Sequence, residues 1–382
     1  MNAIEIHGTV ADGFEDVRTE FAAVVAAEDG ESGAQLAAYV RGRPVVDLWA
    51  GAHVTGTTLT GLHSSTKGAA GLVVALLIQD GVLEVDRPVA EYWPRFGAAG
   101  KGRITVREVL THRCGVINAD GGFTVAELAS DRVIAERLAD QRPFFAPGTS
   151  QGYGGFVTYA IVGEVVRAVT GSSIQELFEQ RIRAPYELDV FLGLPEELDD
   201  RYLPILPWRA TPEMESAFEA NSPNPYGIPG IAYNLNARGF TPADVMTLPN
   251  DARLRRLGQA SAGGVGSARG LAAMYAAAIS GLGDLPPLLS LDTIARITEI
   301  HSSGTDLVRG DNAPYALGFE AKTLIHRFLG AHAFGHTGSA GSDGFGDPHT
   351  GLTYGYTRRR AAFAFTAPEN ARLAAVLHRS HR

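Results

Sequence analysis

One apolar stretch near the start of the chain constrains the fold most strongly. Residues 69–79, AAGLVVALLIQ, are apolar almost all round, so a helix there has no polar face to turn toward water. The longest apolar run within it, GLVVALLI, is far too short to cross a membrane. The helix must therefore lie inside a protein core and end near Gly81. A chain of 382 residues can build such a core, as one large domain or as two lobes.

Composition then narrows the class of protein. The net charge of −9 disfavours nonspecific binding to nucleic acid or to anionic membranes. A single cysteine, Cys114, allows no internal disulfide. The first residues, MNAIEIHGTVADGFEDV, lack the basic and apolar regions of a signal peptide. We therefore expect a cytoplasmic enzyme with no nucleic-acid or membrane partner.

Strand patterns lie near both ends of the chain, and helical patterns dominate the middle. Residues 34–50 read as two strands around a turn at 41–44, and short strands recur in AFGHTGSAG, SDGFGD and GLTYGYT. Helices are predicted at 13–28, 105–115, 133–141, 157–169 and 172–182, and after Ser267 as a helix cap. This order favours an α/β fold, with a sheet lobe from residues 1–85 and 265–382 and a mostly helical insertion at 86–264. Within the insertion, residues 195–260 are rich in Pro, Asn and Gly and predict a long irregular lid or pocket wall.

Ser64 and Lys67, at the start of the buried helix, form the first candidate site. Three residues apart on a helix, they share one face. A serine at a helix start can present its N–H to a developing oxyanion and lose its hydroxyl proton to a neighbouring amine. Only lysine can be that amine, because arginine stays protonated in proteins.

The structural alternative is that the Ser-Ser-Thr sequence merely caps the helix. Lysine scarcity argues for chemistry, since Lys67, Lys101 and Lys322 are the only lysines among 33 basic residues.

Other motifs compete with this serine. Ser150 in GTSQG matches the Gly-x-Ser-x-Gly nucleophile elbow, but Pro147 before it and Gly154–Gly155 after it indicate an open turn. His332 and His336 have zinc-like spacing, yet the neighbouring glycines argue against the helix that such a site needs. We therefore expect no metal and no cofactor. Tyr153 follows the GTSQG turn and could shuttle a proton if it faced Ser64 and Lys67.

Taken in order, Ser64-x-x-Lys67, Tyr153 and His336-Thr337-Gly338 resemble the serine β-lactamase and penicillin-binding-protein superfamily. The likeness is greatest to its class C-like branch of family VIII carboxylesterases and related transacylases, and it extends over roughly residues 30–360. It implies an antiparallel sheet flanked by helices, with the site between this sheet and a helical domain.

The resemblance also implies roles for individual residues. Ser64 would be the acylated nucleophile and Lys67 its base, coupled to Tyr153. The backbone N–H groups of Ser64 and Ser339 would form the oxyanion hole. His336, Thr337 and Gly338 would bind substrate, and so would Gly155, which stands where many relatives have the asparagine of Tyr-x-Asn.

Two departures from the family pattern bear on the substrate. Gly155 supplies no side-chain amide for a β-lactam or peptide, and His336 replaces a permanent cation. Both weaken the case for a β-lactamase or DD-peptidase and favour a small carboxylic ester. Two alternatives stay open: a transacylase that passes the acyl group to an amine or alcohol, and a catalytically silent binding protein on the same fold. The sequence does not indicate an oligomeric state.

Overall fold

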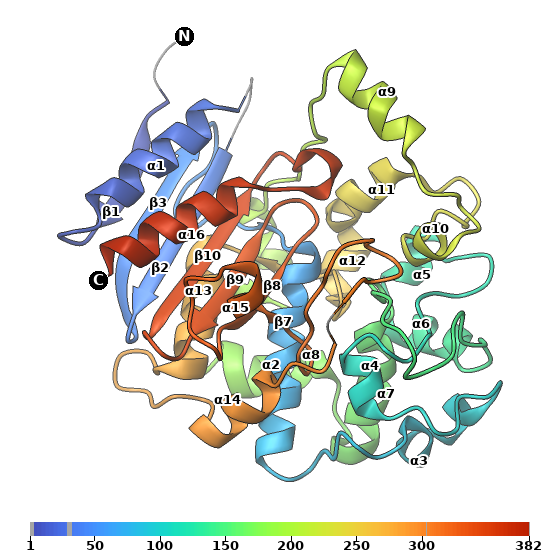
Figure 1. Ribbon diagram of the computed structural model, residues 1–382. Coiled ribbons are helices and arrows are strands. Elements are labelled where there is room, and N and C mark those ends of the chain that lie inside the picture. Colours follow the sequence, from blue (N-terminus) through green and yellow to red (C-terminus); the bar gives the residue numbers. More distant parts are fainter. Residues whose placement is uncertain (1–3, 29–32, 303, 382) are drawn as a thin grey trace.

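A seven-stranded antiparallel sheet forms the framework of the molecule in the computed structural model, which describes residues 4–28, 33–302 and 304–381 (Figure 1). The strand order is β1-β3-β2-β10-β9-β8-β7. The strands are β1 (Ile6–Val10), β2 (Gly33–Val40), β3 (Arg43–Gly51), β7 (Glu320–Ala321), β8 (Phe334–Thr337), β9 (Asp343–Asp347) and β10 (Leu352–Arg358). The predicted strand regions near both ends of the chain are therefore neighbours in one sheet.

Helices cover both faces of this sheet. Helices α1 (Glu15–Ala26) and α16 (Glu369–Ser380) lie side by side on one face (Figure 1). They bury an apolar layer against it that includes Phe21, Leu36, Phe345 and Leu377. Helix α13 (Ala268–Ile279) packs on β2, β9 and β10 from the other face, and the Ser267 hydroxyl caps it by accepting from the Gly270 N–H.

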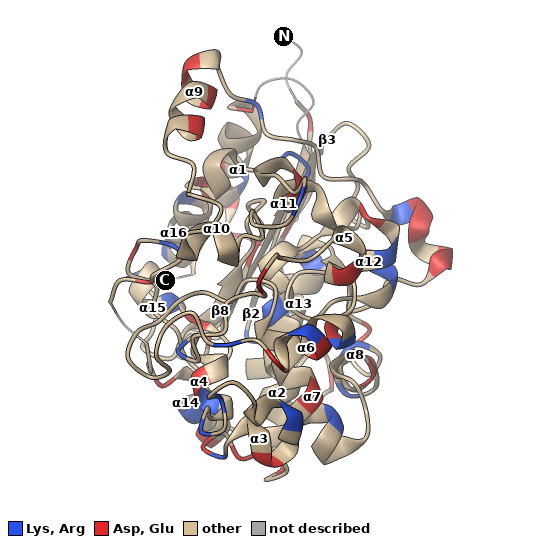
Figure 2. Cartoon of the chain, turned by 90° about the vertical axis from the view of Figure 1, so that its right-hand side faces the viewer, with Lys and Arg blue, Asp and Glu red and all other residues tan. Residues whose placement is uncertain are grey.

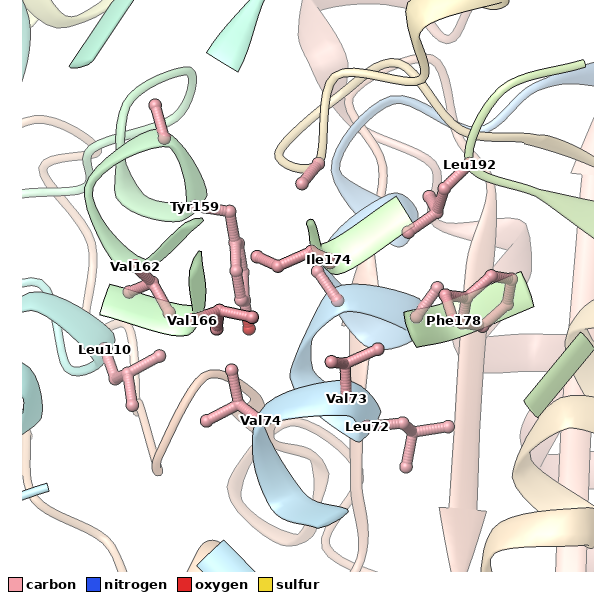
Figure 3. Packing of buried hydrophobic residues seen from close by; sticks show 14 of the residues in the cluster. Leu72, Val73, Val74, Leu110, Tyr159, Val162, Val166, Ile174, Phe178 and Leu192 are labelled. Atoms are coloured by element: carbon pink, nitrogen blue, oxygen red, sulfur yellow. The ribbon is translucent and has the colours of Figure 1, made fainter. Parts of the chain in front are cut away.

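The predicted buried helix is α2 (Thr66–Gln79), and every residue in it from Thr66 to Ile78 is buried. Leu72, Val73 and Val74 on α2 meet apolar side chains of the helical region, such as Tyr159 and Phe178 (Figure 3). The all-round apolar pattern thus reflects neighbours on every side. The helix begins at Thr66, however, and Ser64 lies just before it in a 3₁₀ turn, His63–Ser65.

The middle of the chain is mainly helical, as predicted. Its helices are α3 (Val89–Tyr92), α4 (Val106–Leu110), α5 (Val125–Leu128), α6 (Asp131–Leu138), α7 (Thr158–Thr170) and α8 (Ile174–Phe178). Further on come α14 (Leu291–Thr298) and α15 (Lys322–Ile325). The prediction of a helix over 105–115 was too long. The backbone turns into the left-handed region at His112 (φ 57°) and Gly115 (φ 74°), which ends α4.

The expectation of a long irregular segment at 195–260 is wrong in part. Four short helices interrupt it: α9 (Pro212–Ala220), α10 (Ile228–Ala232), α11 (Pro242–Thr247) and α12 (Ala252–Leu257). Three of the prolines in this segment, Pro212, Pro229 and Pro242, stand in the first turns of α9, α10 and α11, where their missing N–H costs no hydrogen bond. A small second sheet of β4 (Thr60–Gly61), β5 (Val190–Phe191) and β6 (Val265–Gly266) joins the chain on either side of this segment to the residues just before Ser64.

Surface and interior carry different cations. Figure 2 shows acidic residues along α9, charges of both signs on α6 and basic residues on α12. The three lysines are interior residues, since Lys67 is 1% exposed and Lys101 and Lys322 are 0% exposed. In the described part of the chain, no helix combines the length and apolar composition that a membrane crossing requires.

Candidate active site

A strained turn presents Ser64 to a cavity. His63, just before it, has φ of 47°, a left-handed conformation that is uncommon for a residue with a side chain. The buried His63 ring is held by a hydrogen bond of 2.9 Å from Nε2 to the Met246 carbonyl. Ser64 itself is only partly buried and lines the cavity. Residues distant in sequence therefore hold the turn that exposes this serine.

Lys67 lies directly behind Ser64. Its Nζ is 3.5 Å from Ser64 Oγ, 2.6 Å from the Gly155 carbonyl oxygen and 2.9 Å from the Ser261 carbonyl oxygen. Burial lowers the pKa of the Lys67 amine to about 7, although Glu320 and Asp131 pull it upward. At neutral pH a large fraction of this amine is therefore unprotonated, so it can accept a proton.

The adjacent serine, Ser65, does not cap the helix with its side chain. Its hydroxyl instead donates to the His336 carbonyl and contacts Ser342 Oγ, both at 3.0 Å. Ser342 Oγ in turn donates to the Leu62 carbonyl at 2.8 Å. The capping alternative for this Ser-Ser pair is thus wrong, because Ser65 joins the turn to the β8–β9 connection.

Tyr153 closes the cavity beside Ser64 and Lys67. The Lys67 Nζ is 5.0 Å from the centre of the Tyr153 ring. The phenol oxygen is buried and forms no hydrogen bond with any of the described residues. Burial raises the pKa of this phenol, and the neighbouring Ser64 hydroxyl opposes that rise. Tyr153 therefore stays protonated at neutral pH.

The segment 336–339 forms the opposite wall, and His336, Thr337, Gly338 and Ser339 all line the cavity. Burial lowers the pKa of His336 to about 4, so its ring is neutral at pH 7. Its Nδ1 bonds the Thr337 carbonyl at 2.8 Å, so the hydrogen is on Nδ1. Nε2 is left as a buried acceptor with no partner among the described residues. His336 thus contributes no positive charge to the cavity wall at neutral pH.

Gly338 allows this wall to approach the Ser64 turn. A Cβ atom at position 338 would lie 2.4 Å from the Leu62 carbonyl oxygen and 2.3 Å from Ser342 Oγ. Gly338→Ala is therefore expected to push the β8–β9 connection away from Ser64 and lower kcat/KM by about 10²-fold, as small misplacements of reacting groups do.

Gly163→Ala in α7 is the matched control for this variant. A Cβ there meets nothing nearer than Ile174 Cδ1 at 3.9 Å. It should keep the activity and gain up to about 1 kcal/mol in the free energy of unfolding. Equal ester turnover by both variants would contradict the role of Gly338.

A buried ion cluster supports the wall, and the sequence interpretation missed it. The Glu320 carboxylate accepts from the Thr337 N–H at 3.0 Å and from Thr337 Oγ1 at 2.7 Å. Lys322 Nζ lies 3.0 Å from Glu320 and 2.6 Å from Asp343, and Arg309 lies 3.3 Å from Glu320. The carboxylate that orients Thr337 is therefore neutralised by two cations.

His112 was missed as well, because its neighbourhood suggested only a helix. Its ring packs edge-on against both Tyr153 and Tyr315, with ring centres 4.8 Å and 4.4 Å away. Its Nδ1 accepts a hydrogen bond from the Gly154 N–H at 3.2 Å. This buried histidine thereby holds both the ring of Tyr153 and the backbone next to it. No local sequence pattern marks such a role.

The cavity has a volume of about 300 Å³ and unites most of the predicted site residues. It is lined by Ser64, Tyr153, Gly155, His336, Thr337, Gly338 and Ser339, and Lys67 lies behind Ser64. Tyr233 and Val245, from the 195–260 segment, add an apolar wall, together with Phe365 from the C-terminal region. That segment is therefore a pocket wall in part, as expected.

Ser150 stands apart from this cavity. It lies in a turn, with no strand before it, and the next helix starts only at Thr158. It is not among the residues that line the cavity. Its surroundings therefore lack the strand-turn-helix context of a nucleophile elbow.

Known proteins resemble the chain over nearly its whole length. Residues 19–379 match the β-lactamase family. The esterase/β-lactamase LipL of Mycobacterium tuberculosis (strain ATCC 25618 / H37Rv) is 29% identical over 364 residues, which are 91% of this chain and 81% of that protein. The structure of EstA from Arthrobacter nitroguajacolicus Rue61a is 37% identical and superposes with a TM-score of 0.89 over 98% of both chains.

A further solved structure, of a family VIII carboxylesterase, is 32% identical, with a TM-score of 0.83 over 99% of this chain and 100% of that one. These matches confirm the fold and the family resemblance inferred from the ordered motifs. The chain belongs to the β-lactamase family, and it is an enzyme of the serine hydrolase type on that fold.

Proposed function

We propose that the protein hydrolyses a carboxylic ester through an acyl-enzyme on Ser64. The observation that carries this proposal is the Ser64–Lys67 pair: a hydroxyl at a cavity wall, 3.5 Å from a buried amine with a pKa of about 7. Such an amine can take a hydroxyl proton at neutral pH. Relatives described as an esterase/β-lactamase and a family VIII carboxylesterase support ester chemistry.

The proposed reaction has two halves. Lys67 accepts the Ser64 proton as Oγ attacks the ester carbonyl, and the N–H groups of Ser64 and Ser339 stabilise the oxyanion. The C–O bond to the alcohol then breaks, and the alkoxide takes the Tyr153 phenol proton, which the Lys67 ammonium restores. Water next attacks the acyl-enzyme and loses a proton as Ser64 regains one. The products are the carboxylic acid and the alcohol.

Side-chain chemistry in the cavity favours an ester over a β-lactam. The neutral His336 supplies no permanent cation for a substrate carboxylate, and Gly155 supplies no amide group. An ester also needs less help to expel its leaving group than an amide does, because an alkoxide is a much weaker base than the anion of an amine.

Covalent labelling tests the nucleophile. A fluorophosphonate probe should label the wild type on the peptide that contains Ser64, as identified by mass spectrometry. Ser64→Ala should abolish labelling, and Ser150→Ala should label at the wild-type rate. Label on Ser150 would overturn the proposal. Turnover of the same ester with added alcohol or amine would show whether water or another acceptor receives the acyl group.

The pH dependence should report on Lys67. Only the neutral amine can act as base, so kcat/KM should rise with pH through an apparent pKa near 7. Glu320 is the charge that acts most strongly to raise the Lys67 pKa. Glu320→Gln should therefore move the acidic limb of the profile to lower pH.

Asp311→Asn is the control for this shift, because it removes a carboxylate from the same cavity that is not among the charges acting on Lys67. Its acidic limb should stay in place. If the acidic limb of the pH profile did not move in Glu320→Gln, the limb would not report the titration of Lys67.

A further inference from the structure

A second, larger cavity opens beside the catalytic one. It has a volume of about 920 Å³, compared with about 300 Å³ for the catalytic cavity. The two share wall residues, among them Arg309, Glu320, Thr337 and Phe365. A substrate that reacts at Ser64 can therefore extend across these residues into the second cavity. A small ester needs only the first.

Part of the wall of the second cavity is apolar, beside polar residues such as Thr323 and Arg327. Leu324 and Ile325 line it from α15, and their exposed fractions are 50% and 40%. Ala371 in the first turn of α16 and Ala367 just before this helix also line it. Two adjacent large apolar side chains that face water at a cavity are an unfavourable arrangement unless an apolar group covers them.

Contacts of its first residue, Lys322, hold helix α15 in place. The Lys322 N–H donates to the Ala333 carbonyl at 2.9 Å, and its buried amine lies between Glu320 and Asp343. Leu324 and Ile325 are thus presented by a fixed turn, which favours binding because little order has to be gained.

The passage between the cavities is polar, but its charges are paired. Arg309 lies 3.3 Å from Glu320 and 3.1 Å from Asp311. Since these groups neutralise one another, an apolar chain can pass over them without facing an unpaired charge. The ring of Phe365 borders both cavities and offers an apolar surface along the same path.

We propose that the second cavity binds an extended apolar arm of the ester substrate, with Leu324 and Ile325 as its contact residues. This proposal rests on the proposed ester hydrolysis at Ser64. It assigns the substrate class as large esters with a long aliphatic or aromatic arm.

Chain-length series test this assignment. We would measure kcat/KM for p-nitrophenyl acetate, butyrate, octanoate and laurate, which lengthen the acyl side, and for a matched series of alkyl acetates, which lengthen the alcohol side. In the wild type, one of the two series should rise with length. The double variant Leu324→Ser/Ile325→Ser should lose about tenfold on the longest member of that series. It should keep wild-type activity on acetate.

Leu291→Ser is the matched control, because Leu291 is 78% exposed on α14 and lines neither cavity. It should behave as the wild type throughout. The assignment would be overturned if kcat/KM of the wild type did not change with chain length in either series. It would also be overturned if the double variant kept the length preference of the wild type. Failure of the proposed function looks different: the wild type would not turn over even the acetate, or Ser64→Ala would retain turnover.

Discussion

Replacing Lys67 by methionine is expected to lower kcat/KM for ester hydrolysis by about 10³-fold, the typical contribution of a positioned base. Methionine has a similar length and suits a buried site, but it has no amine to receive the Ser64 proton. Lys67→Arg should be equally inactive, because guanidinium stays protonated and its larger head does not fit a side chain that is 1% exposed. The rate of fluorophosphonate labelling measures the acylation step directly.

Lys101→Met separates catalysis from folding. The Lys101 amine is held by the carbonyls of Ala98, Ala139 and Gln141 at 2.6–3.0 Å, much as Lys67 is held by those of Gly155 and Ser261. Either methionine leaves buried carbonyls unpaired, at about 1–3 kcal/mol each. Lys101→Met should therefore lose stability but keep its activity per folded molecule. Wild-type labelling of Lys67→Met would eliminate Lys67 as the base.

Lys322→Met should give the largest loss of stability, about 3–5 kcal/mol, as expected when a buried ion pair loses one partner. Lys322 is 0% exposed and lies within 3.0 Å of both Glu320 and Asp343, which are 1% and 0% exposed. Without this amine, no cation of the described residues lies within 3 Å of Asp343, and Arg309 at 3.3 Å is the arginine or lysine among them that still pairs with Glu320. Urea unfolding followed by circular dichroism measures the change.

An exposed ion pair is the appropriate comparison for Lys322. Arg87 lies 2.9 Å from Glu91 and 3.6 Å from Glu84 on the surface. Arg87→Met should cost at most about 1 kcal/mol. If the two variants lost equal stability, burial would not be what makes the Lys322 cluster important. Because Glu320 orients Thr337, Lys322→Met should also reduce turnover at temperatures where it stays folded.

Much of the fold was predictable because its strongest signals are local. The all-round apolar pattern identified α2, and the turn at 41–44 separated β2 from β3, where Arg41 and Gly42 have positive φ. The prediction of an irregular segment at 195–260 was wrong in part, because proline is common both in loops and in the first turns of helices. Propensity alone does not separate those two cases.

Lysine scarcity does not by itself mark a catalytic residue in this chain. The rarity of lysine favours a chemical role for Lys67, yet all three lysines are buried. The amines of Lys101 and Lys322 are fully engaged by carbonyls or carboxylates. In this chain lysine marks an interior site for a compact cation with three donors, and arginine supplies the surface charges. What distinguishes Lys67 is its serine neighbour and the cavity in front of it.

The supporting residues of the site were not predictable from local patterns. Glu320 and Asp343 are far from Ser64 in sequence, and His112 belongs to a stretch that suggested only a helix. Each acts through contacts that exist only in the folded chain. The ordered motifs named residues that face the cavity, but they carried no information on the groups that hold those residues in place.

The sheet order has a kinetic consequence. Strand β10 pairs with β2, for example Tyr356 with Leu36, and Ser65 bonds the His336 carbonyl across 271 positions of the chain. Contacts between residues so far apart in the sequence form slowly. The long loop between them must close, at a cost in chain entropy, before the contacts can stabilise the fold. During refolding, helical signals should return before ester turnover does. Recovery of activity thus reports when the N-terminal and C-terminal parts of the chain have paired in the sheet and at the site.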